Sequence, residues 1–199
     1  MAVVALAPSL VQAQSKQTQV HIVAFKEDMS EILVRVQDLA QGAAFQVREM
    51  DTNKVKKQTA IVDKADEDKQ LKALTKKYKL AANTDQQDPK GRYMVMGGPD
   101  KSHGYRIMVL RGARIGVVGT VALNKEDVTK KDAKAMLKEV VWAPDGKKIM
   151  AVVNQKIDRQ DGLEDVDEIH YFLFKDWKVK WLQPEPEEGA PSEEGGGDQ

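Results

Sequence analysis

The sequence predicts a mainly β fold, in which three blade-like antiparallel β-meander repeats form an open array or sandwich braced by one or two α-helices. Strand-type segments, with apolar and polar side chains alternating between turn residues, outnumber helical ones along the 199 residues. A turn of the Pro-Asp-Gly type recurs together with the chain around it. The composition, 41% hydrophobic and 31% charged, is typical of a globular chain long enough for one domain with a core.

The repeat is clearest around VVWAPDGKKIMAVV, residues 140–153. At a constant offset of 117 this segment matches VAFKEDMSEILVRV, residues 23–36, and at an offset of 55 it matches part of QDPKGRYMVMG, residues 87–97. Each copy continues with a further strand, a short polar turn and a final strand. Within a single domain over 14–182, the copies are expected at about 20–62, 86–123 and 139–182.

The turn chemistry explains why these residues recur. Proline presets φ at the second position of a type I turn, aspartate tolerates the third, and glycine takes the positive φ that follows. The residues in these places are Pro144, Asp145 and Gly146 in the third copy, and Pro89 and Gly91 in the second. In the first copy Glu27 replaces the proline and Met29 replaces the glycine. That turn is therefore expected to differ or to carry strain.

The stretch WAPDGKKI, residues 142–149, resembles the blade motif of TolB-type, WD-repeat-like β-propellers. The resemblance implies that the aromatic residue packs between blades and that Pro-Asp-Gly makes the first hairpin turn. It also implies binding rather than catalysis, often in the bacterial periplasm. Propellers have four to eight blades, whereas this chain has room for three, so a closed propeller is not expected.

Two helices are predicted to interrupt the array. The segment 66–82 places Leu71, Leu74 and Tyr78 on one face, with acids at its start and lysines at its end. The segment 126–139 has a weaker helical pattern. We expect the first helix to cover the last sheet of the array.

The end of the array, residues 169–182, carries large apolar residues. The segment 169–174 is apolar on both faces and should be covered on both sides. In the strand that follows, Trp177, Val179 and Trp181 are expected on one face with lysines outward, which is typical of a half-buried edge strand. The alternative cover for this end is a partner or a second copy docked on Trp177 and Trp181.

Both ends of the chain differ from the predicted domain. Residues 1–13 are predicted to be a signal-peptide remnant, because Val11-Gln12-Ala13 suits cleavage before Gln14, which places the mature protein in the periplasm or outside the cell. The alternative is a disordered apolar leader of a cytoplasmic protein. The apolar run is too short to be a transmembrane segment. Residues 183–199, here called the acidic tail, contain six acidic residues and no base, and are expected to be disordered.

Several functional classes are disfavoured. The chain contains no cysteine, which excludes disulfides, thiolate metal sites and a cysteine nucleophile. Because the whole chain has zero net charge and residues 183–199 contain six acids and no base, residues 1–182 have a net charge of +6, too small to favour nucleic-acid binding. The three histidines, His21, His103 and His170, are scattered, and no hydrolase or phosphate-binding motif is present.

The best metal candidate is the acidic segment 158–168, whose hard oxygen ligands could hold Ca²⁺. The candidate ligands are Asp158, Asp161, Asp165 and Asp167. A solvated acidic hairpin loop is the competing interpretation and has more weight, because Gly162 does not fit the register of an EF-hand loop. No other cofactor is predicted.

Together these patterns predict a non-catalytic exported binding or scaffold module that acts through protein–protein interaction in the cell envelope. Its partner would be an unidentified envelope protein or a second copy. The alternative is a small-molecule-acting enzyme of the hydrolase type that uses carboxylates the sequence does not identify. A pocket in which histidine and acids converge would favour the enzyme, and a flat apolar surface would favour the binding module.

Overall fold

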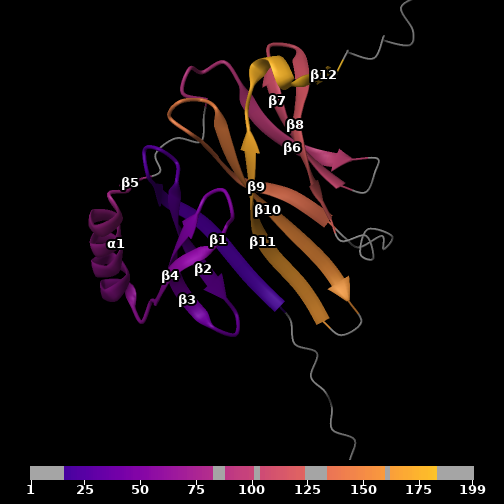
Figure 1. The fold of residues 1–199 in the computed structure, drawn as a ribbon. Coiled ribbons are helices and arrows are strands. Elements are labelled where there is room, and N and C mark those ends of the chain that lie inside the picture. The colour runs from indigo at the N-terminus through magenta and orange to yellow at the C-terminus, as the bar shows by residue number, and fades with distance from the viewer. Residues whose placement is uncertain (1–15, 83–87, 101–103, 124–133, 160–161, 183–199) are drawn as a thin grey trace, which may run out of the picture.

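The computed structural model describes residues 16–82, 88–100, 104–123, 134–159 and 162–182 (Figure 1). The fold is mainly β, as predicted, with antiparallel meanders and one α-helix in the described part of the chain. The strands of the first sheet are β1 (Lys16–Phe25), β2 (Glu31–Asp38), β3 (Gly42–Glu49), β4 (Val55–Ala60), β5 (Ala81–Ala82), β9 (Lys134–Trp142), β10 (Lys148–Arg159) and β11 (Gly162–Leu173). The second sheet contains β6 (Met94–Asp100), β7 (Gly104–Arg111), β8 (Arg114–Ala122) and β12 (Lys180–Leu182).

The first sheet joins the first and third repeats. Its strand order is β4-β3-β2-β1-β11-β10-β9, with β5 also paired to β1. Neighbouring strands are antiparallel except at the junction, where Lys16–Thr18 of β1 run parallel to Glu164–Val166 of β11. Beyond Thr18 the two strands separate. The two meanders are thus one continuous sheet that bends at this junction.

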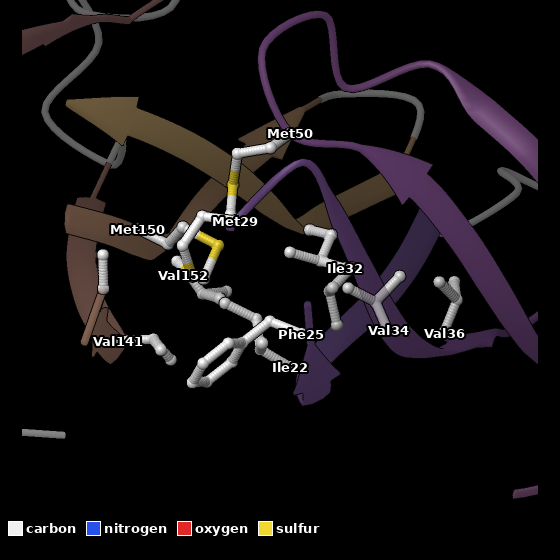
Figure 2. Packing of buried hydrophobic residues seen from close by; sticks show 12 residues of the cluster. Ile22, Phe25, Met29, Ile32, Val34, Val36, Met50, Val141, Met150 and Val152 are labelled. Atoms are coloured by element: carbon white, nitrogen blue, oxygen red, sulfur yellow. The ribbon is translucent and has the colours of Figure 1, made fainter. Parts of the chain in front are cut away.

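The bend brings the two ends of the first sheet face to face around a shared core (Figure 2). Ile32 and Val34 of β2 belong to the same buried cluster as Met150 and Val152 of β10, although two strands, β1 and β11, lie between β2 and β10 in the sheet order. All four side chains are at most 1% exposed. Because side chains alternate along each strand, these four point to the concave face. The residues between them point to the opposite face, which is also covered, so the strands carry apolar residues on both faces.

Helix α1 (Lys64–Tyr78) covers the convex face of the first meander. Its buried Leu74 packs with Leu33, Phe45 and Val47 of β2 and β3, and Leu71 and Tyr78 border that cluster. The prediction that this helix covers the last sheet of the array was therefore wrong. Because α1 follows β4 after a short link, it returns to the face of its own meander.

The helix is also shorter than predicted at its C-terminal end. Asp63 caps its N-terminus by accepting from the backbone N of Asp66 at 2.8 Å. Lys79 ends it in a left-handed conformation, with φ 52°. Ala81 and Ala82, expected to be helical, form β5 instead.

The second predicted helix, 126–139, is wrong where the structure describes it. Residues 134–139 belong to β9, in which Ala135 and Leu137 alternate toward the second sheet and pair with β10. Pairing and burial outweigh a weak local helical preference. Residues 126–133 lie outside the described residues.

The second sheet packs on the outer face of β9–β11. Ala151 and Val153 of β10 contact a cluster that contains Ile107 of β7 and Phe172 of β11. Gly119 of β8 allows this approach, because a Cβ there would lie 2.5 Å from the Phe172 ring. The third repeat contributes its last strand, β12, to this second sheet by pairing with β8. The result is a sandwich on one half of the first sheet and a helix on the other.

The same turn occurs in all three repeats. Its closing hydrogen bonds are Met29 N to Lys26 O at 2.8 Å, Gly91 N to Asp88 O at 2.7 Å and Gly146 N to Ala143 O at 2.8 Å. The donor residues have φ of 57°, 62° and 68°. Met29 therefore adopts the strained conformation predicted for it. Its side chain is buried, 2% exposed, and belongs to the core cluster drawn in Figure 2.

The first and third of these turns connect hairpins, as predicted for Glu27 and Pro144. The turn at Pro89 is followed by β6, whose partner in the described residues is β7. The segment before that turn, 83–87, lies outside the described residues. The hairpin role of Pro89 therefore stays a prediction.

Replacing Gly146 by Val should lower the free energy of unfolding by about 1 kcal/mol or more, because a β-branched residue resists positive φ. Gly146→Asn is the matched control, since Asn tolerates the left-handed region and should cost clearly less. Urea denaturation followed by circular dichroism measures both. Equal losses for the two variants would show that the backbone conformation is not the cause.

The predicted signal-peptide remnant and the acidic tail fall outside the described residues. Both therefore stay predictions. No helix within the described ranges is long and apolar enough to cross a bilayer.

Candidate functional site

Two buried carboxylates accept hydrogen bonds from the backbone of β1 beyond Thr18, where β1 no longer pairs with β11. The backbone N of Val20 donates to Oδ2 of Asp167 at 2.9 Å, and the backbone N of Ile22 donates to Oε2 of Glu139 at 3.1 Å. Asp167 is 4% exposed and Glu139 is 6% exposed. The carboxylates thus replace the carbonyl groups that a neighbouring strand would offer, because buried amides need an acceptor.

Asp167 is the centre of a polar network under this junction. Its Oδ2 also accepts from Nζ of Lys138 at 2.8 Å, and its Oδ1 accepts from the amide of Asn154 at 2.8 Å. The same Asn154 amide donates to Oδ1 of Asp165 at 2.7 Å. Both carboxylate oxygens of Asp167 are therefore held by donors.

Glu139 also binds a histidine. Nδ1 of His21 lies 2.9 Å from Oε2 of Glu139, and the ring is largely exposed. Because an ionised carboxylate only accepts, Nδ1 is the donor in this contact, which leaves Nε2 outside it. The pair opens into a cavity of about 260 Å³ lined by Gln19, Val20, His21, Arg35, Gln37, Lys138 and Glu139.

The sequence did not reveal this pair, because 118 positions separate His21 from Glu139. No local motif surrounds either residue. Glu139 stands next to the apolar run Val140-Val141-Trp142, and an acidic residue beside a buried strand was the signal that could have been used. His170, in β11, is partly buried and lies 3.5 Å from Glu168, whose pKa is lowered chiefly by that contact.

The structure describes only part of the predicted calcium site. The carboxylates of Asp165 and Asp167 both accept from the Asn154 amide, and Asp167 also pairs with Lys138, so these oxygens already have donors. The side chain of Asp158 and the whole of Asp161 lie outside the described residues. Among the side chains that are described, no three acidic or histidine residues are placed to hold a metal ion. Calcium binding stays a prediction.

A groove of about 480 Å³ lies between β6 and β9, the edge strands of the two sheets. Its lining is Gly91, Arg92, Tyr93, Met94, Val95, Leu110, Gly112, Leu137, Lys138, Glu139 and Val140. Within the described residues β6 pairs with β7 alone and β9 with β10 alone. The backbone N of Leu137 donates instead to the Tyr105 hydroxyl at 2.8 Å, across the groove between the sheets.

The two predicted anchor tryptophans differ in exposure. Trp181, in the edge strand β12, is half-buried against the core and lies under the Arg114 guanidinium at 4.7 Å from its ring centre. Trp177 is 78% exposed, because it lies in the 3₁₀ turn η1 (Asp176–Lys178) rather than in a strand. The prediction that Trp177 shares the face of Trp181 was therefore wrong. The turn closes when Lys178 N donates to Lys175 O at 2.8 Å.

The preceding strand agrees better with its prediction. Ile169 and Tyr171 border the core of the first sheet, while Phe172 and Phe174 pack toward the second sheet. This strand is covered on both sides, except that Leu173 is 63% exposed at its end.

Comparison of the chain with models of protein families, with curated proteins and with solved structures finds no match. The resemblance to TolB-type blades therefore rests on residues 142–149 alone. The class of protein has to be argued from the geometry described above.

Proposed function

We propose that this protein is a non-catalytic binding module that acts through protein–protein contacts after export to the periplasm or the cell exterior. The observation that supports the binding function is the groove in which two edge strands, β6 and β9, meet. Edge strands offer backbone donors and acceptors to another chain. Export is supported by the cleavage pattern before Gln14, and N-terminal sequencing of the native protein tests it.

An extended peptide of the partner is the occupant that fits this groove. A strand added to β6 or β9 would continue a sheet by main-chain hydrogen bonds, while side-chain pockets give specificity. The lining includes Val95, Leu110 and Leu137, which offer apolar surface to the side chains of such a peptide. The lining also contains Arg92 and Lys138, which already pair with Asp88 and Asp167, so the apolar side chains of the peptide would give most of the specificity.

A positive charge added to either edge strand, β6 or β9, should abolish binding of the partner. Met94, 67% exposed on β6, and Met136, 56% exposed on β9, can be changed to Lys without disturbing the core. Lysine on an edge strand discourages strand addition. We expect proteins cross-linked to the wild type in native envelope fractions to be lost with Met94→Lys and with Met136→Lys, as measured by quantitative mass spectrometry.

Val62→Lys is the matched control, because Val62 is 85% exposed between β4 and α1, away from the groove. It should retain the partner. If the groove variants and the control capture the same proteins in the same amounts, the groove is not the binding site.

A second candidate function is hydrolysis, which the His21–Glu139 contact favours. An acid that holds Nδ1 of a histidine and leaves Nε2 toward a cavity is the arrangement of a general base. The described lining contains no Ser or Thr, so the base would have to activate water. This candidate has less support, because Glu139 also accepts from the backbone of Ile22 and so has a structural role.

Turnover of a panel of nitrophenyl esters tests the hydrolase. If the protein hydrolyses any of them, His21→Gln should reduce the rate to that of buffer, whereas His170→Gln should leave it unchanged. Wild type without turnover, or full activity of His21→Gln, rules out this role for the pair.

A further inference from the structure

Four turns lie together at the end of the molecule where β12 is labelled in Figure 1. They are residues 88–92, 111–114, 145–148 and 175–180, here called the basic end. Direct contacts connect them. Phe174 N donates to Lys147 O at 2.7 Å, and Arg111 lies 3.5 Å from Asp176. The guanidinium groups of Arg92 and Arg111 lie 5.0 and 5.8 Å from the centre of the Tyr93 ring.

The basic end has a large excess of positive charge. It contains nine Lys and Arg residues and three Asp residues, which leaves six net positive charges. Asp88 and Asp176 pair with Arg92 and Arg111. The other seven cations have no carboxylate within ion-pair distance among the described residues; they are Lys90, Arg114, Lys147, Lys148, Lys175, Lys178 and Lys180.

One acidic residue outside these four turns, Asp28, interacts with a cation of the basic end, Lys148. Asp28, between β1 and β2, has a pKa below its usual value, mainly because Ser30 hydrogen-bonds to its carboxylate, with smaller contributions from the charges of Lys26 and Lys148. This single contact does not balance the cations on the other turns.

An exposed aromatic residue lies among these cations. Trp177 is 78% exposed, with Nζ of Lys178 at 5.1 Å and Nζ of Lys175 at 5.8 Å from its ring centre. A large aromatic residue in water beside unpaired cations is typical of a contact surface, because it offers area and a polar edge to a partner.

The chain itself provides a matching partner. From Leu182, the last residue of β12, the sequence continues directly into the acidic tail, 183–199, which has six negative charges and no base. Its 17 residues extend up to about 55 Å, more than enough to reach all four turns. Tethering gives such a segment an effective concentration in the millimolar range.

We propose that the acidic tail, residues 183–199, binds the basic end of its own chain and covers Trp177. The contact neutralises like charges that the turns hold together. It buries little apolar surface, so it should weaken with salt and contribute little to overall stability. The basic end borders the groove between β6 and β9, because Gly91, Arg92 and Gly112 belong to both. The lysines counted in the test below do not line the groove, so either proposal can fail without the other.

Zero-length carbodiimide cross-linking of the full chain tests the contact, because it joins a carboxylate to a lysine in direct contact. Helix α1 supplies the internal control: Lys69, Lys72, Lys76 and Lys77 are exposed, as are the basic-end lysines counted below apart from the half-buried Lys148. At low salt, we expect tail acids to cross-link to Lys90, Lys147, Lys148, Lys175 and Lys178 at least about fivefold more than to the helix lysines, and the excess to vanish at about 0.5 M NaCl.

Equal yields at the two sets of lysines would overturn the proposal. So would cross-links found only between molecules, as detected by mixing isotopically labelled and unlabelled protein. Lys180 is left out of the count, because it lies next to the tail in the sequence.

Fluorescence quenching provides a second, independent measurement. In a full-length variant with the six tail acids replaced by Gln or Asn, iodide should quench Trp177 more strongly than in the wild type, because the uncovered cations attract iodide. Trp177→Phe in both backgrounds assigns the signal to that residue. Identical quenching of Trp177 with the charged and the neutral tail would overturn the proposal.

Discussion

Replacing Asp167 by Ala should lower the free energy of unfolding by about 3–5 kcal/mol, as expected when one member of a buried charged network is removed. The substitution leaves the backbone N of Val20 and Nζ of Lys138 without this acceptor, and it removes one of the two acceptors of the Asn154 amide. Each unsatisfied buried group costs about 1–3 kcal/mol, more where it is charged. Urea denaturation at neutral pH, followed by circular dichroism, measures the loss.

Asp165→Ala is the matched control. Asp165 accepts from the same Asn154 amide, but its side chain is 27% exposed, so water replaces the lost contact. Its substitution should cost about 1 kcal/mol or less. A small and equal loss in both variants would mean that Asp167 does not secure the edge of β1, and that water satisfies Val20 there.

Replacing Trp142 by Ala should have a comparable effect, about 3–5 kcal/mol, because it opens a large cavity in the core. Trp142 is 3% exposed and lies between the two sheets. Its ring stacks on Tyr93 with centroids 6.2 Å apart, and Phe174 approaches edge-on at 5.0 Å. Trp142 comes from the third repeat and Tyr93 from the second, so the loss falls on the contact between repeats.

Trp177→Ala is the control for Trp142, since it removes the same side chain from an exposed position. It should change the free energy of unfolding by no more than about 0.5 kcal/mol. The near-ultraviolet circular dichroism signal from tryptophan should fall strongly with Trp142→Ala, which leaves only the contribution of the half-buried Trp181, and should change little with Trp177→Ala. A signal lost with Trp177→Ala and kept with Trp142→Ala would mean that Trp177, not Trp142, is the packed tryptophan, which would contradict the structure.

Local features of the fold were predictable from the sequence. Turns depend on a few neighbouring residues, so Pro144-Asp145-Gly146 was sufficient to predict both the hairpin and the positive φ at its end. The equivalent position in the first repeat was predicted to be strained, and Met29 does adopt φ 57°. The mainly β class follows from the same kind of evidence, since alternation has a period that one segment can show.

The helices show where local evidence becomes insufficient. The pattern at 66–82 has caps, charge placement and an apolar face, and a helix forms there. The pattern at 126–139 is weaker, and its described part becomes β9 because Leu137 is buried against the second sheet. The sequence could not tell which sheet α1 covers, because an apolar face such as that of Leu71 and Leu74 does not specify its partner.

The candidate site was not predictable for the same reason. His21 and Glu139 meet because β1 leaves β11 after Thr18 and passes over β9, which is a consequence of how the first sheet bends. The basic end likewise assembles from four turns whose charges are unremarkable one at a time. By itself, the sequence determined the turns, the strands and the class of fold, since these depend on residues within a few positions of one another. The order of the strands, the buried carboxylates of β9 and β11 that bind the edge of β1, and the charge at one end were decided by the tertiary structure, because they depend on which apolar faces meet when the chain closes its core.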